Sequence, residues 1–137
     1  MSLNKLKITV LTRAKGLCEY CKSPANISSQ PFAIEHIIPK SKGGKNSEDN
    51  LALSCQGCNN YKYNKTSGID YISGATADIF HPRQHNWCDH FAWSDNVIEI
   101  IGISAIGRIT VEVLRLNRLE LKNLRHLLSD AGLHPPE

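Results

Sequence analysis

The fold of this chain is decided by the stretch from residue 18 to residue 59, which contains Cys18-Glu19-Tyr20-Cys21, then Glu35-His36-Ile37-Ile38-Pro39, and finally Cys55-Gln56-Gly57-Cys58-Asn59. In each Cys-x-x-Cys pair the intervening turn aims both sulfur atoms at one point, and two such pairs complete the tetrahedral sulfur set that zinc prefers. We therefore predict a structural Zn2+ ion held by Cys18, Cys21, Cys55 and Cys58. The alternative is a set of unrelated buried thiols or redox pairs.

The composition is that of a soluble globular protein. The chain has 137 residues, of which 41% are apolar and 21% are charged, and no apolar run approaches the ~20 residues that a membrane span requires. Residues 1–10 do not resemble a signal peptide, so we expect a cytoplasmic protein with no membrane partner. Five cysteines without an export signal favour metal thiolates over disulfides, and we expect the fifth, Cys88, to be a buried or partly buried free thiol.

The net charge of +3 is unevenly distributed along the chain. Residues 1–65 carry ten basic and four acidic residues, a net +6, whereas residues 66–137 carry six and nine, a net −3. Four thiolates and one Zn2+ ion would lower the first value to about +4. A positive face on the metal-binding half suits a polyanionic partner, because neutralisation of phosphates drives affinity that does not depend on sequence.

The first half predicts a helix, a short hairpin and a second helix. Residues 5–15 have a weak helical pattern that ends near Gly16, and residues 32–38 are apolar and β-branched, which predicts a strand ended by Pro39. A flexible basic loop over residues 41–46 precedes a second short strand at residues 50–53. A polar helix should then run from Cys55 to about Lys65. So small a unit needs the zinc ion for stability.

The second half predicts one strand and two helices around aromatic anchors. A strand is expected over residues 97–103, a helix over residues 106–116, and a last helix that starts with a capping box of Asn117 and Glu120 and stops at Gly132. Trp87, Phe91 and Trp93 should anchor the core. We therefore predict an α+β fold with a zinc-stapled core, residues 1–66, and an α/β C-terminal extension, residues 67–137, packed on it as one compact domain.

The central segment carries the groups that phosphodiester hydrolysis needs. The imidazole of His36 can take a proton from water near neutral pH. In an extended strand Glu35 points to the opposite side, so one of the two side chains can bind metal while the other faces substrate. Asn59, in the first turn of the following helix, offers a neutral oxygen to the same ion. Such a sparse set of hard oxygen ligands is typical of Mg2+ at phosphate sites.

Together with Gly43-Gly44, Asn50-Leu51 and Lys62, these motifs resemble those of HNH endonucleases. The resemblance covers about residues 18–62 and implies the ββα-metal fold, with His36 as general base and Asn50 orienting its ring. It also implies that Glu35 and Asn59 bind the catalytic divalent ion, and that the products carry 5′-phosphate and 3′-hydroxyl ends. A monomer with one site should nick one strand of DNA. Parts of the second half, such as Phe80-His81-Pro82-Arg83, resemble an extension found on some prokaryotic HNH proteins.

The chain departs from the family pattern at two positions. Asn59 replaces the commoner histidine, which favours Mg2+ or Mn2+ over Zn2+ at the catalytic site because an imidazole ligand is lost. Glu35 replaces the commoner aspartate and adds one methylene. The rival hypothesis, which Asn59 keeps open, is a catalytically weak or inactive zinc-stabilised DNA-binding module.

The expected partner is double-stranded DNA, bound through its phosphates. The lysines expected to contact phosphate are Lys40, Lys42, Lys45 and Lys62. We reject a second metal site at His81, His85 and His90, because their spacing matches no standard ligand set. A homodimer, or a larger defence or mobile-element complex recruited through the second half, is the remaining partner hypothesis.

Overall fold

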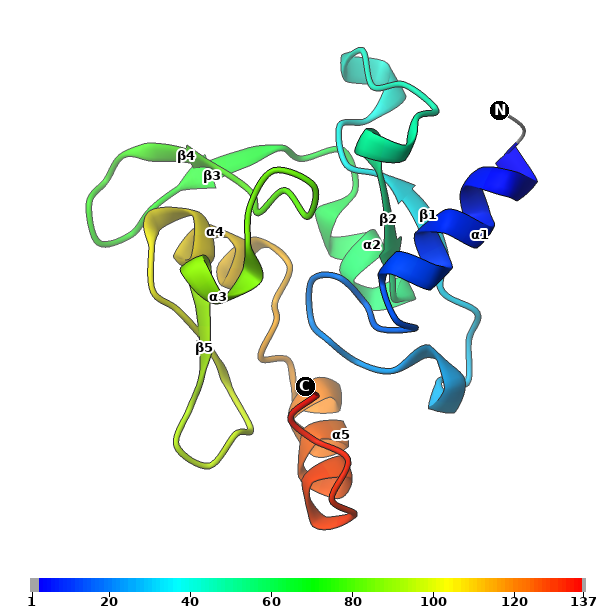
Figure 1. The fold of residues 1–137 in the computed structure, drawn as a ribbon. Helices are drawn as coiled ribbons and strands as arrows, with labels where there is room; N and C mark the ends of the chain where they lie inside the picture. The colour runs from blue at the N-terminus through cyan, green and yellow to red at the C-terminus, as the bar shows by residue number, and fades with distance from the viewer. Residues whose placement is uncertain (1–2, 137) are drawn as a thin grey trace.

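A β-hairpin followed by a helix forms the central unit of the fold. The computed structural model describes residues 3–136, in which β1 (Ala33–His36) pairs antiparallel with β2 (Leu51–Ser54), with Ala33 opposite Ser54 and His36 opposite Leu51. Helix α2 (Gln56–Lys62) follows directly. We call β1, β2 and α2 the ββα unit (Figure 1). The predicted order of strand, loop, strand and helix is confirmed.

Helix α1 (Leu3–Arg13) covers one face of the hairpin. Leu6, Val10 and Ala14 form a buried cluster with Leu51 and Leu53 of β2. The predicted helix is thus confirmed with its bounds shifted toward the N-terminus. It ends where Lys15 and Gly16 adopt positive φ angles of 56° and 71°, which an α-helix cannot continue through.

The rest of the chain builds two further antiparallel hairpins and three helices. The elements are β3 (Ser67–Ile69), β4 (Thr76–Asp78), α3 (Trp87–His90), β5 (Phe91–Trp93), β6 (Ile100–Gly102), α4 (Ala105–Val113) and α5 (Leu119–Asp130). Short 3-10 turns lie at Ala25–Ile27, Lys40–Lys42 and Glu48–Asn50. Figure 1 shows the ββα unit and α1 on the right, the β3–β4 hairpin, α3 and α4 on the left, and α5 below. The mixture of helices and small sheets confirms the predicted α+β class.

One hydrophobic core joins the two halves of the chain. We call the two Cys-x-x-Cys turns, residues 18–21 and 55–58, the first and second knuckles. The core contains their four cysteines, Tyr20, Ile37 and Ala52 from the first half and Ile79, Phe80, Phe91, Ile100, Ile109, Leu114, Leu116 and Leu121 from the second. Trp87 and Trp93 pack against it, with the Trp87 ring 5.0 Å from that of Phe91, which confirms the predicted aromatic anchors. The extension therefore buries the face of the ββα unit that α1 leaves uncovered.

Three local predictions for the second half are wrong. The strand expected over residues 97–103 is limited to Ile100–Gly102, because Val97 sits in a turn with φ of 59°. Asn117 does not cap the last helix, since its side chain instead bonds both the N–H and the carbonyl of Ile100, at 2.8 Å each. Cys88 is exposed rather than buried.

No helix within residues 3–136 is both long and apolar enough to cross a membrane.

Candidate functional site

The four knuckle cysteines converge on one point. Their sulfur atoms lie within 4.8 Å of one another, all four residues are buried, and the Cys21 and Cys55 sulfurs are 3.7 Å apart. A Zn2+ ion bound at about 2.3 Å to four sulfurs needs edges of about 3.8 Å between them. The cluster therefore fits the predicted Zn2+ ion.

Local hydrogen bonds support the turn of each knuckle. The backbone N–H of Cys21 lies 3.5 Å from the Cys18 sulfur, and that of Cys58 lies 3.4 Å from the Cys55 sulfur. Hydrogen bonds from the other three thiols hold the pKa of Cys55 far below its usual value, while burial raises the pKa of Cys18. In each Cys-x-x-Cys turn a backbone N–H thus points at one sulfur, and such a hydrogen bond favours a thiolate there.

Arg118, at the start of α5, lies over the sulfurs of the second knuckle. One guanidinium nitrogen is 3.5 Å from the Cys55 sulfur and the other is 3.7 Å from that of Cys58. A side chain at Gly57 would collide with this guanidinium, because an added Cβ would lie 2.4 Å from Arg118. Four thiolates and one Zn2+ ion leave a charge of −2, which the Arg118 cation partly offsets.

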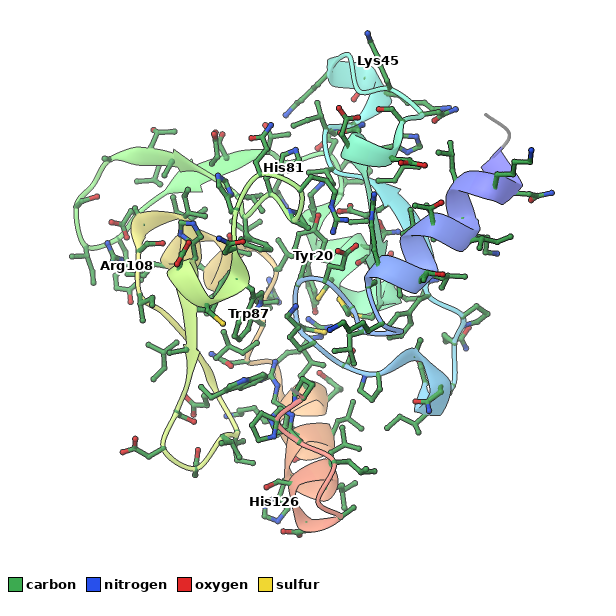
Figure 2. The ribbon with its side chains drawn as sticks, viewed as in Figure 1. Tyr20, Lys45, His81, Trp87, Arg108 and His126 are labelled. Carbon is green, nitrogen blue, oxygen red and sulfur yellow. The ribbon has the colours of Figure 1, made fainter. Side chains whose placement is uncertain are left out.

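Glu35 points from β1 toward α2 and is buried. Its side chain is 4% exposed, one oxygen accepts the hydroxyl of Tyr20, and the other lies 3.3 Å from the ammonium of Lys62. Burial raises the pKa of Glu35, and the charge of Lys62 opposes that rise. Figure 2 shows Tyr20 in the interior, between the ββα unit and the extension.

Lys62 does not lie on the surface, where the phosphate contact expected for it would require its ammonium. It is 1% exposed, and its ammonium donates to the carbonyl of Ile37 at 2.8 Å and faces that of His36 at 3.4 Å. Together with Glu35 these groups use all three donors of the ammonium. A lysine satisfied in this way has no donor left for a nucleic acid.

His36 lies at the end of β1 and points to the opposite side from Glu35, as strand alternation requires. Its side chain is half-buried, and its Nε2 atom lies 2.5 Å from the Oδ1 atom of Asn46. The ring is therefore oriented by the loop that connects β1 to β2.

Asn50 stabilises this loop through hydrogen bonds to the backbone and makes no hydrogen bond to the ring of His36. Its amide oxygen accepts the N–H of Ile38 at 2.8 Å, and its amide nitrogen donates to the carbonyls of Ile38 and Lys45 at 3.0 Å each. The loop passes so close to Ile38 that only glycine fits at Gly44, where an added Cβ would lie 1.7 Å from the Ile38 carbonyl oxygen. The expected ring contact of Asn50 is thus made by Asn46 instead.

Asn59 lies on α2, one turn before Lys62, and is half-buried. Its backbone groups bond Cys55 and Tyr63, but its side chain makes no hydrogen bond to any part of residues 3–136. The amide oxygen is therefore free to bind a ligand.

The lysines of the β1–β2 loop are exposed and lie at one end of the ββα unit. Lys40 and Lys42 belong to a 3-10 turn, and Lys45 follows two residues after Gly43, whose φ is 88°. Figure 2 shows Lys45 projecting from the tip of this loop. These three side chains are available to solvent, unlike Lys62.

The oxygens around Lys62 are a suitable environment for a cation. The Lys62 ammonium stands where Glu35 and the carbonyls of His36 and Ile37 direct their oxygens. Hard oxygen donors of this kind fit Mg2+ or Mn2+ better than a soft ion. The Glu35 carboxylate can therefore be a ligand of such an ion once it is released from the ammonium.

Sequence reasoning missed three residues that shape the site. From the sequence, Tyr20 was recognised only as part of the first knuckle, Asn46 as part of a loop and Arg118 as a residue near the start of the last helix. In the structure they contact Glu35, His36 and the sulfurs of the second knuckle, respectively. Only the glycine at position 57 hinted at a close neighbour of the second knuckle. The partners of Tyr20 and Arg118 lie 15 or more residues away, so no local pattern marks these contacts.

Comparison with known proteins supports the resemblance seen in the motifs. Residues 18–65 match the family model described as HNH endonuclease. The chain is also 33% identical over 57 residues to the Type IV methyl-directed restriction enzyme EcoKMcrA of Escherichia coli (strain K12). That match covers 39% of this chain and 21% of the relative, so the chain spans about a fifth of its length. No solved structure matches.

Proposed function

Starting from the HNH endonuclease domain at residues 18–65, we propose that this protein is a metal-dependent DNA endonuclease. The observation that carries the proposal is the ββα unit itself, with His36 on one side of β1 and Glu35 facing α2 on the other. A base and a hard oxygen ligand thus lie on adjacent residues of one rigid hairpin. The similarity to a restriction enzyme supports DNA as the substrate.

His36 is the general base in this proposal. One nitrogen of its ring removes a proton from the attacking water. Two asparagines, Asn46 and Asn50, hold the ring in place. Asn46 contacts Nε2 directly, and Asn50 fixes the loop that carries Asn46 by bonding Ile38 and Lys45. Asn46 and Asn50 are therefore positioning residues.

Glu35 and Asn59 are the residues that would hold a Mg2+ or Mn2+ ion. The bound ion supplies positive charge to the scissile phosphate and the leaving 3′ oxygen. Hydrolysis in this geometry leaves 5′-phosphate and 3′-hydroxyl ends, and a monomer with one site nicks one strand. Lys40, Lys42 and Lys45 contact neighbouring phosphates and hold the duplex over the loop.

The proposal is tested with supercoiled plasmid DNA and zinc-loaded protein in Mg2+, Mn2+ or EDTA. Wild type should convert the plasmid to the nicked form only with a divalent ion, and His36→Ala should lower the rate at least about 100-fold, as expected for loss of a general base. The matched control is His126→Ala, because His126 is exposed on α5 and, within residues 3–136, pairs only with Asp130. Zinc content is measured in every sample, so that loss of the structural ion in EDTA is not mistaken for loss of the catalytic one.

One observation favours a second candidate function, a DNA-binding module without nuclease activity. The proposed ligand Glu35 is already paired with Lys62 and Tyr20. Salt-sensitive DNA binding by wild type, with equal absence of nicking in wild type and His36→Ala, would establish this module and reject the nuclease.

A further inference from the structure

The pairing of Lys62 with Glu35 has a consequence for how the site takes up its metal. We propose that the Lys62 ammonium is a built-in cation that occupies the Glu35 carboxylate in the resting protein, and that a divalent ion binds there only by displacing it. The inference rests on the proposed function for one point, the choice of Glu35 as a metal ligand.

The geometry around the ammonium resembles that around a bound cation. Three oxygens surround it, from the Ile37 carbonyl at 2.8 Å, the Glu35 carboxylate at 3.3 Å and the His36 carbonyl at 3.4 Å. Lys62 itself is 1% exposed, so water does not compete for these contacts. A buried charge is held in this way only when it is paired and hydrogen-bonded.

The ammonium and a divalent ion compete for the carboxylate. Mg2+ requires oxygen atoms at about 2.0–2.1 Å, and both Glu35 oxygens already have partners, Tyr20 on one and Lys62 on the other. An ion placed on either oxygen would lie a few ångströms from the ammonium in buried surroundings, where like charges repel strongly. Metal binding and the Lys62–Glu35 pair therefore oppose each other through charge repulsion.

A cavity next to Lys62 can accept its side chain after displacement. This cavity of about 180 Å³ borders Lys62 and is lined by, among others, Ile38, Asp78 and His81. Figure 2 shows His81 on the loop from β4 to α3, which lies in space between the β3–β4 hairpin and the ββα unit. Lys62 is also the last residue of α2, where the helix ends at Tyr63 with φ of 50°, so its side chain can turn without disturbing a following helical turn.

The first test measures metal binding rather than cleavage. Binding of Mn2+ to zinc-loaded full chain is followed by electron paramagnetic resonance for wild type and Lys62→Met. Lys62→Met should bind Mn2+ about tenfold more tightly or better, because the competing charge is gone. Lys65→Met is the matched control and should bind as wild type does. Among the described residues, the exposed Lys65 ammonium donates only to the Tyr61 carbonyl.

A double variant tests whether the higher Mn2+ affinity of Lys62→Met depends on Glu35. Adding Glu35→Gln to Lys62→Met should abolish the gain, because the ion then loses the carboxylate. The inference is overturned if Lys62→Met binds Mn2+ no more tightly than wild type, or if its gain survives Glu35→Gln.

A second measurement needs no substitution and decides the matter if Lys62→Met does not fold. The buried, hydrogen-bonded Lys62 ammonium should give its own 1H–15N resonance in zinc-loaded wild type. Titration with Mg2+ should shift or remove this signal with the same midpoint as metal binding, and an unchanged signal at saturating Mg2+ would refute displacement. Neither measurement uses cleavage, so failure of the nuclease assay and failure of this inference are distinguishable.

Discussion

Replacement of Arg118 by methionine should weaken zinc binding, although Arg118 is not a ligand. The substitution keeps the apolar stem and removes a guanidinium that lies 3.5 Å from the Cys55 sulfur and 3.7 Å from the Cys58 sulfur. Outer partners of metal ligands commonly contribute about 10- to 100-fold in affinity. These N–H···S contacts are long and half-buried, so we expect the lower end, about tenfold or ~1.4 kcal/mol.

The same residue also donates to the carbonyls of Leu114 and Arg115, at 3.1 Å and 3.2 Å, and these bonds are lost too. Arg118 also lies over the ring of Tyr61, at 5.6 Å. Arg115→Met is the control for loss of that contact, because Arg115 lies over the same ring at 4.8 Å and, within residues 3–136, makes no hydrogen bond to sulfur. Zinc affinity is measured by competition with a chromogenic chelator at neutral pH. Wild-type affinity in Arg118→Met, or an equal loss in Arg115→Met, would refute the electrostatic argument.

Two further predictions concern DNA binding and pH. Replacing Lys40, Lys42 and Lys45 together by glutamine should reduce the slope of log binding constant against log salt by up to about 2.7 for duplex DNA, and a wild-type slope would remove these lysines from the interface. Asp70 bonds both Arg108 and Ser73, and these hydrogen bonds lower its pKa in the folded state. Its contribution to stability is therefore complete above the ordinary pKa of about 3.9 and is lost as pH falls below it. Asp70→Asn should lower the thermal midpoint at pH 7 and lower it less at pH 3. The control Asp78→Asn, at an exposed residue, should leave the thermal midpoint unchanged at both pH values. A difference between Asp70→Asn and wild type that does not depend on pH would contradict this account.

The sequence by itself was sufficient for the metal-binding core. Each Cys-x-x-Cys turn, the strand before Pro39 and the helix that opens after Cys55 are specified by residues close together in the chain. The structure contains each of them, although the strand ends at His36 and not at Pro39. Spacing is informative here because a turn of two residues fixes where two sulfurs point. The Glu35-His36 pair was equally local, since strand alternation alone sends the two side chains to opposite sides.

Only the tertiary structure decided which charges face which partners. Lys62 was expected to contact phosphate, but its ammonium is buried against the Glu35 carboxylate and the carbonyls of His36 and Ile37. Arg118 reaches sulfurs 60 or more residues away because the extension packs on the second knuckle at Gly57. Periodicity reports whether a side chain faces inward, but not what it meets there, since the partner of a buried charge is chosen by the packing of segments far apart in the chain.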